Sequence, residues 1–157
     1  MALLFEPIKL RTIELKNRIV VSPMCEYSSV DGFANDWHLV HLGSRAVGGA
    51  GLILTEAAAV SPEGRITPDD LGIWKEEHII NLKRIVQFIE SQKSVAGIQL
   101  AHAGRKASHH SPWKGGHALT KEEGAWQTVA PSAIAFKEGE PLPHAVTTTQ
   151  IKNVVYD

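Results

Sequence analysis

The spacing of apolar residues along the chain predicts three buried strands separated by two helices. The apolar runs at 18–22, 51–55 and 95–101 are nearly continuous, as expected for strands that are covered on both faces. Apolar residues at helical spacing occupy the segments between them, after Asn35-Asp36 and over 76–92. This alternation predicts an α/β fold with a parallel sheet and right-handed crossovers.

Weaker patterns flank this central part. Residues 5–17 alternate loosely around Arg11-Thr12, which predicts a short hairpin ahead of the first strand. Residues 103–146 show no period and contain several prolines and glycines, so we interpret them as a long functional loop after the third strand. Thr147-Thr148-Thr149-Gln150 is a capping-box sequence, which predicts a helix that begins there and runs to the end of the chain.

Composition narrows the class of protein. The chain has 157 residues, of which 43% are hydrophobic and 21% charged, and this fits one ordinary globular domain. A net charge of -1 gives no general attraction to nucleic acid or to an anionic membrane, and no apolar run approaches the ~20 residues that span a bilayer. The single cysteine excludes an internal disulfide and, without a signal-peptide pattern, favours a cytoplasmic location.

Polar or small residues follow the predicted strands. Cys25 and Tyr27 come after the first strand, Ala57 after the second, and Gln99 lies among apolar residues of the third. The carboxyl ends of the strands form the active-site face of a β/α barrel, so we expect these residues to converge there. Other readings stay open, because most free cysteines are small buried hydrophobes and a buried glutamine can satisfy the core backbone. Tyr27 is either a rim aromatic or a proton donor.

The histidines raise a metal-dependent hydrolase as an alternative. His38 and His41 have i, i+3 spacing on a predicted helix, and His102, His109 and His110 follow the third strand. Metal sites need further convergent ligands, and no carboxylate or cysteine is obviously placed with the first pair. We therefore predict no metal site, with the first pair packed on a helix face and the loop pair at the surface.

Four longer motifs run through the chain. They are LKNRIVVSPMC at 15–25, GLILTEA at 51–57, IQLAHAGRK at 98–106 and APSAI at 130–134. Together they resemble the Old Yellow Enzyme family of FMN-dependent ene-reductases, and the cysteine after Pro-Met is similar to the bacterial xenobiotic reductase and NADPH dehydrogenase subgroup. The resemblance implies a TIM (β/α)8 barrel, of which these residues would form the N-terminal hairpin and about three βα units.

The resemblance also implies roles for individual residues. Cys25 would tune the potential of the flavin, Ala57 and Gln99 would contact its isoalloxazine ring, and Tyr27 would contact the activating carbonyl of the substrate. The segment that lines FMN would be Ser22, Pro23, Met24 and Cys25. The implied reaction is the reduction of an α,β-unsaturated small molecule with hydride from NADPH or NADH.

The family's paired substrate-binding histidines and its phosphate-binding loops would lie on later strands than those found in this sequence. We therefore expect residues 1–157 to be the N-terminal part of a single FMN-binding barrel domain. The alternative is an inactive fragment or assembly module that needs a C-terminal segment. Self-association into a homo-oligomer stays open.

Overall fold

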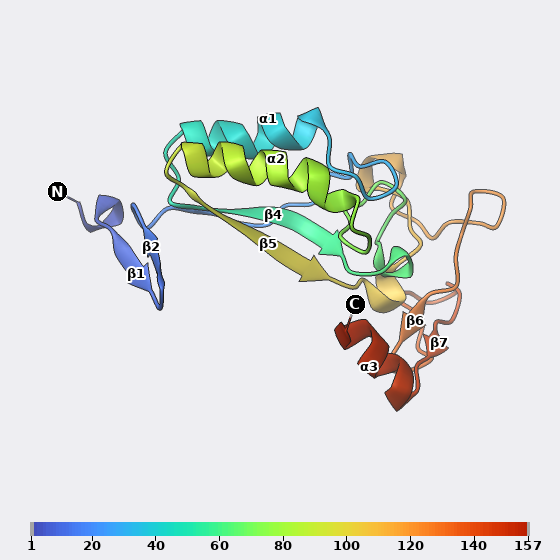
Figure 1. Cartoon of the computed structure of the whole chain (residues 1–157). Coiled ribbons are helices and arrows are strands. Elements are labelled where there is room, and N and C mark those ends of the chain that lie inside the picture. Colours follow the sequence, from blue (N-terminus) through green and yellow to red (C-terminus); the bar gives the residue numbers. More distant parts are fainter. Residues whose placement is uncertain (1, 157) are drawn as a thin grey trace.

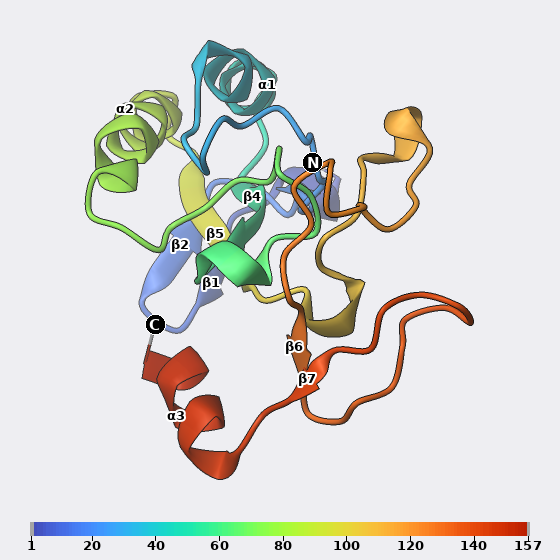
Figure 2. The same ribbon diagram turned by 90° about the vertical axis from the view of Figure 1, so that its right-hand side faces the viewer.

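A three-stranded parallel sheet forms the centre of the computed structural model, which describes residues 2–156 (Figure 1). Its strand order is β3-β4-β5, formed by Val20–Val21, Leu52–Ala59 and Val95–Ala101. The helices α1 (Asp36–Val47) and α2 (His78–Ser91) connect the strands and lie on the same face of the sheet (Figure 2). The predicted α/β class and the strand–helix order are confirmed.

The predicted flanking elements are also present. The antiparallel hairpin of β1 (Ile8–Leu10) and β2 (Ile13–Leu15) lies at the end of the sheet where the parallel strands begin (Figure 1). The helix α3 (Thr148–Tyr156) follows the capping box, in which the Thr147 N–H donates to Gln150 Oε1 at 2.8 Å. The hairpin and the start of α3 could be predicted because each depends on residues that are close in sequence.

The strand β4 continues four residues beyond its predicted end and contains a bulge. Leu54 is opposite Gly97, whereas Ala57 is opposite Gln99, so β4 carries one extra residue between them. The bulge breaks the alternation of faces, and Thr55 and Glu56 are both buried. Alanine has little preference for strands, so the apolar pattern alone did not predict the extension.

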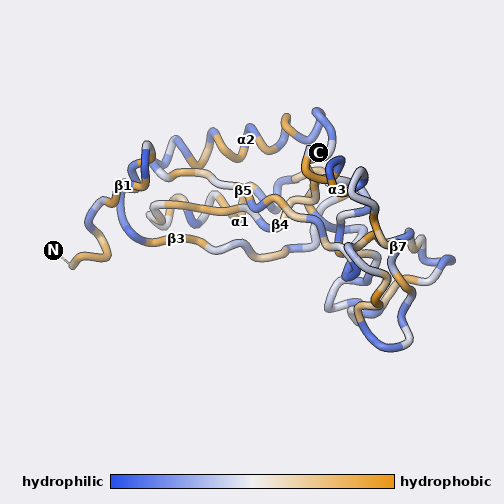
Figure 3. The backbone as a smooth tube through the Cα atoms, turned by 90° about the horizontal axis from the view of Figure 1, so that it is seen from below, coloured by the Kyte–Doolittle hydropathy of each residue, from blue (hydrophilic) through white to orange (hydrophobic). Residues whose placement is uncertain are grey.

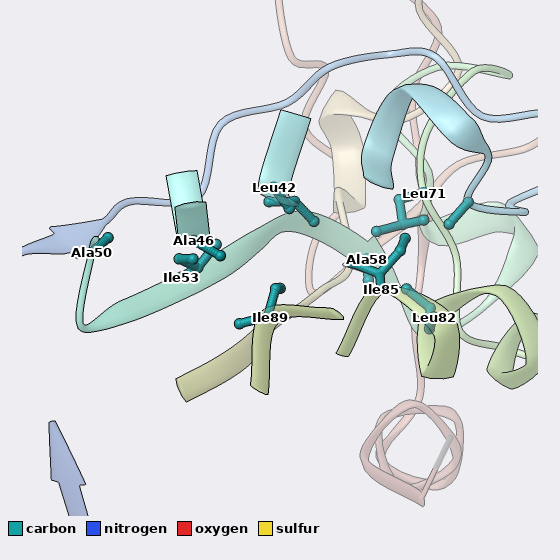
Figure 4. Packing of buried hydrophobic residues seen from close by; sticks show 10 residues of the cluster. Leu42, Ala46, Ala50, Ile53, Ala58, Leu71, Leu82, Ile85 and Ile89 are labelled. Atoms are coloured by element: carbon teal, nitrogen blue, oxygen red, sulfur yellow. The ribbon is translucent and has the colours of Figure 1, made fainter. Parts of the chain in front are cut away.

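The core lies between the sheet and its two helices (Figure 4). Ile53 of β4 is fully buried, and Leu42 and Ala46 of α1 lie against the sheet beside it. Ile85 and Ile89 of α2 complete this layer. Burying one such side chain contributes about 1.5–3 kcal/mol, so this layer fixes the strands whose ends form the candidate site.

The opposite face of the sheet has no covering layer among residues 2–156. Hydrophobic stretches follow the strands in the view from below (Figure 3). β5 pairs with β4 alone, and Leu100 near its end is 63% exposed. No helix in this described range combines the length and apolarity needed to cross a membrane.

The segment 103–146, which we call the excursion, lies at the carboxyl ends of the strands (Figures 1 and 2). It is largely irregular, as predicted, but contains short 3-10 turns at Gly104–Lys106 and Pro112–Lys114. Two short strands, β6 (Val129–Ala130) and β7 (His144–Ala145), pair in parallel within it. The excursion is thus an ordered part of the strand-end face.

Arg65 connects the excursion to the rest of the chain through contacts with two tryptophan rings. The Arg65 guanidinium lies over the rings of Trp74 and Trp126, at 5.3 and 5.1 Å from their centroids. The indole N–H of Trp126 also donates to the Glu63 carbonyl at 3.0 Å. Stacked cations of this kind contribute about 0.5–2 kcal/mol each, which favours a fixed position for this part of the excursion.

We predict that the 157-residue chain self-associates through the unpaired edge of β5, because such an edge offers hydrogen-bonding groups to a second chain. Leu100→Lys should shift the mass measured by light scattering after gel filtration towards the monomer. Val40→Lys on α1 is the matched control, since Val40 is also exposed, at 61%, but lies on a helix. A monomeric parent chain with a sharp melt independent of concentration would contradict this prediction.

Candidate functional site

The predicted site residues meet where β3, β4 and β5 end. Residues 22–25 lead out of β3, and the Cys25 thiol interacts with the Tyr27 hydroxyl and with the backbone of Ala57. Ala57 is in turn the register partner of Gln99. The structure therefore brings Cys25, Tyr27, Ala57 and Gln99 to one edge of the sheet.

This edge is open to solvent on the face of the sheet opposite the helices α1 and α2. Ser22, Met24 and Cys25 are exposed, whereas Pro23 is half-buried. Gln99 is exposed, because no described element covers this face of β5, so the reading of Gln99 as a buried core glutamine does not apply to residues 2–156. An exposed amide that can both donate and accept is suited to bind a polar ligand.

Tyr27 has an unusual backbone conformation. Its φ of 45° lies in the left-handed region, which is uncommon for a residue other than glycine. The ring packs edge-on against Trp113 of the excursion, with centroids 5.4 Å apart. On the following residue, the Ser28 carbonyl accepts a hydrogen bond from Asn35 Nδ2 at 2.6 Å. Such strain persists only where surrounding contacts fix it, and it is common at functional sites.

A buried carboxylate fixes the start of this turn. Glu56, in the bulge of β4, is 2% exposed, and its Oε2 accepts the Glu26 backbone N–H at 2.8 Å. Its other oxygen, Oε1, lies 3.0 Å from His38 Nε2. His38 is itself 1% exposed, and its Nδ1 accepts the Asn35 N–H at 3.1 Å, which leaves Nε2 to donate to Glu56.

A second carboxylate stands beside the first. The side chain of Glu26 is 6% exposed, and its Oε1 lies 3.5 Å from His41 Nε2. Burial, followed by repulsion from Glu56, raises the pKa of Glu26 from 4.5 to about 7. Glu26 therefore exchanges a proton near neutral pH, directly between Cys25 and Tyr27 in the chain.

Both reactive side chains of the turn stay protonated at neutral pH. Although Cys25 as a residue is exposed, neighbouring atoms partly desolvate its thiol and raise the pKa of that thiol above its ordinary value, while the hydrogen bond with Tyr27 acts in the opposite direction. Burial and the neighbouring Cys25 raise the pKa of Tyr27 to about 12. The turn thus presents a neutral thiol and a phenol that can donate a hydrogen bond.

The network of Glu26, Glu56 and His38 was missed in the sequence. A signal was present, because Glu56 directly follows a strand that was predicted to be covered on both faces, and a charge that is buried there needs a partner. The prediction that the first pair packs at the helix is confirmed, because His38 is buried and the His41 ring lies 6.3 Å from that of Trp37. The prediction that the loop pair lies at the surface is wrong for His109, whereas His110 is partly exposed. His109 is 5% exposed, and its Nδ1 lies 2.9 Å from the Ala107 carbonyl.

Comparison with known proteins supports the motifs. The model of the NADH:flavin oxidoreductase / NADH oxidase family matches residues 3–157. An NADH:flavin oxidoreductase of Gibberella zeae is 48% identical over 98% of this chain and 38% of its own length. An NADPH dehydrogenase of Bacillus subtilis is 46% identical over 98% of this chain and 42% of its own length.

A solved structure shows the same fold. The Old Yellow Enzyme from Pichia sp. AKU4542 superposes with a TM-score of 0.79 at 31% identity, over 96% of this chain and 39% of that one. The resemblance to the Old Yellow Enzyme family and the predicted barrel class are confirmed. The chain spans about 40% of the length of the relatives it matches.

We predict that stability falls as pH rises from about 4.5 to 7. In this window the folded chain keeps a proton on Glu26 that the unfolded chain has lost. Rising pH therefore favours the unfolded state and lowers the free energy of unfolding. Glu26→Gln should flatten this part of the dependence of the urea midpoint on pH. Burial lowers the pKa of His41, so the titration of this residue makes stability rise with pH, and it does so equally in the parent and in the variant. Parallel curves for parent and variant would contradict the assignment.

Proposed function

Because the chain belongs to the NADH:flavin oxidoreductase / NADH oxidase family, we propose that it forms the first part of an ene-reductase site. The whole enzyme reduces activated α,β-unsaturated small molecules with hydride from NADPH or NADH. The observation that carries the proposal is the convergence of Cys25, Tyr27, Ala57 and Gln99 at the strand ends of a chain with this ancestry.

The strand-end edge fits a flat heterocycle such as the ring system of FMN. Ala57 carries only a methyl group and leaves the β4 backbone accessible, and the exposed Gln99 amide can donate and accept beside it. Ser22, Pro23, Met24 and Cys25 would line the same ligand from β3. FMN, when bound, supplies the hydride-transfer chemistry between the nicotinamide and the alkene.

Tyr27 has the properties of a group that binds the activating carbonyl of the substrate. Its phenol has a pKa of about 12 and is therefore protonated at neutral pH, and its ring packs against Trp113. A hydrogen bond donated to the carbonyl oxygen would stabilise the negative charge that develops there. Cys25 contacts both Tyr27 and the Ala57 backbone, so its neutral thiol is placed to act on the flavin electronically.

The chain accounts for only part of such a site. In TIM barrels a phosphate group is frequently bound by loops after strands seven and eight, whereas the described strands correspond to the first three. Arg105 and Lys106 are exposed, but they follow β5 and lie elsewhere around the barrel. The second reading, an assembly module, is favoured by the open edge of β5 and is separated from the first by the experiment below.

We predict that residues 1–157 alone bind FMN weakly and without fixed stoichiometry. A chimaera that joins them to the remaining C-terminal part of the Bacillus subtilis NADPH dehydrogenase should bind one FMN per barrel. The measurement is quenching of flavin fluorescence during titration of each protein. Tight, stoichiometric quenching by the 157-residue chain would contradict the placement of the phosphate site. A folded chimaera without flavin would instead favour the assembly module.

Tyr27→Phe in the same chimaera should lower kcat for reduction of 2-cyclohexenone by about 10²-fold or more, because a positioned proton or hydrogen-bond donor contributes about that much. Flavin content and oxidation of NADPH by the flavin alone should stay unchanged. The other tyrosine, Tyr156, is 87% exposed, and Tyr156→Phe is the matched control. Equal kcat values for the two variants would remove Tyr27 from the reaction.

Cys25→Ala should shift the reduction potential of the bound flavin while the fold stays intact. The loss of one small, exposed side chain leaves little packing defect, so the thiol itself is what the change removes. Cys25→Ser, which retains a hydroxyl donor, should give a smaller shift. An unchanged potential and absorption spectrum in Cys25→Ala would show that Cys25 does not act on the flavin and has only a structural role.

A further inference from the structure

Three metal-ligating side chains meet in the excursion, and the proposed ene-reductase chemistry uses none of them. His110, His117 and Glu123 each offer a ligand atom, and these atoms all lie within 4.8 Å of one another. Two imidazoles and one carboxylate form a ligand set that binds divalent transition metals in proteins. The cluster was missed in the sequence because its members are not spaced like a known motif.

The backbone places the two histidines side by side. The His110 N–H donates to the His117 carbonyl at 2.9 Å, and His109 forms an antiparallel bridge with Ala118. Residues 109–118 therefore form a closed loop that contains the 3-10 turn Pro112–Lys114, and His110 and His117 lie opposite each other where it closes. Their ring centroids are 4.6 Å apart.

The carboxylate is oriented by its own turn. The Thr120 N–H donates to Glu123 Oε2 at 2.9 Å, and Thr120 Oγ1 lies 3.3 Å from the Glu123 nitrogen, to accept its N–H. This reciprocal pair leaves the other oxygen, Oε1, directed at His110. Glu123 Oε1 lies 3.1 Å from His110 Nε2, so this oxygen is placed to bind an ion together with the imidazole.

One nitrogen of the cluster lacks a satisfactory partner. His110 Nε2 lies 3.1 Å from Glu123 Oε1, yet it is buried and makes no well-directed hydrogen bond within the described residues. Buried polar atoms in folded proteins are normally satisfied by protein, water or an ion. A nitrogen that points towards a carboxylate and a second imidazole is the arrangement expected at a metal site.

We propose that His110, His117 and Glu123 bind a divalent transition-metal cation of the zinc type, with water in the remaining position. His117 and Glu123 are exposed, so an ion can enter from solvent, and the side chain of His117 can move inward to the distance of about 2.0–2.1 Å that zinc requires. The bound ion would join the closed loop to the turn at Thr120. His117 and Thr120 also line a cavity of about 710 Å³, so the ion would stiffen one wall of that cavity.

The test is calorimetric titration of the tag-free chain with zinc chloride, in a Cys25→Ser background that removes the thiol as a competing ligand. We expect one zinc per chain, with at least tenfold weaker binding for His117→Ala and for Glu123→Gln. The matched controls, which should bind as the parent does, are Glu122→Gln, the neighbouring exposed acid, and His144→Ala, an exposed histidine in β7.

Both site variants carry exposed substitutions, so a loss of binding does not reflect unfolding, and far-UV circular dichroism checks this directly. Nitrogen-15 shifts of the imidazoles provide a second readout, in which zinc should move the resonances of His110 and His117 and leave those of His144 in place. The proposal is overturned if the parent binds no zinc. It is equally overturned if His117→Ala and Glu123→Gln bind zinc as tightly as the controls.

Discussion

The buried carboxylate of Glu56 is the constraint on which the candidate site depends. An ionised side chain at 2% exposure costs several kcal/mol of lost hydration unless it is paired and hydrogen-bonded. Glu56 meets this requirement with the Glu26 N–H on one oxygen and His38 on the other. These two contacts join β4 to the turn after β3 and to α1.

The hydrogen bonds of Glu56 also link the start of α1 to the turn at Tyr27. His38 is oriented by the N-cap residue Asn35, whose side chain accepts the Trp37 N–H and whose amide also holds the Ser28 carbonyl. The start of α1 and the turn at Tyr27 are therefore parts of one hydrogen-bonded unit. The bulge in β4 makes this possible, because it directs Glu56 towards α1 and returns Ala57 to the face shared with Gln99.

Local signals in the sequence predicted the fold well. The hairpin, both core helices, the parallel sheet and the capping box at Thr147 each depend on periodicity or on residues within one turn of each other. The bulge was not predictable in this way, because it is defined by the register with β5 rather than by β4 itself. The burial of His109 and the exposure of Gln99 depend on which layers cover each face, and periodicity does not contain that information. The positions of Cys25, Tyr27 and Ala57 were predictable because strand ends in this topology converge.

Hydrogen exchange at the amide of Glu26 tests most directly whether Glu56 holds the turn. Glu56→Ala removes the acceptor of this amide, so exchange over residues 25–29 should accelerate by at least tenfold. Amides in the middle of α2, to which Glu56 makes no hydrogen bond, should keep their protection. Unchanged protection at Glu26 would contradict the account. A uniform loss across the turn and α2 would also contradict it, because Glu56 would then support the global fold rather than this turn.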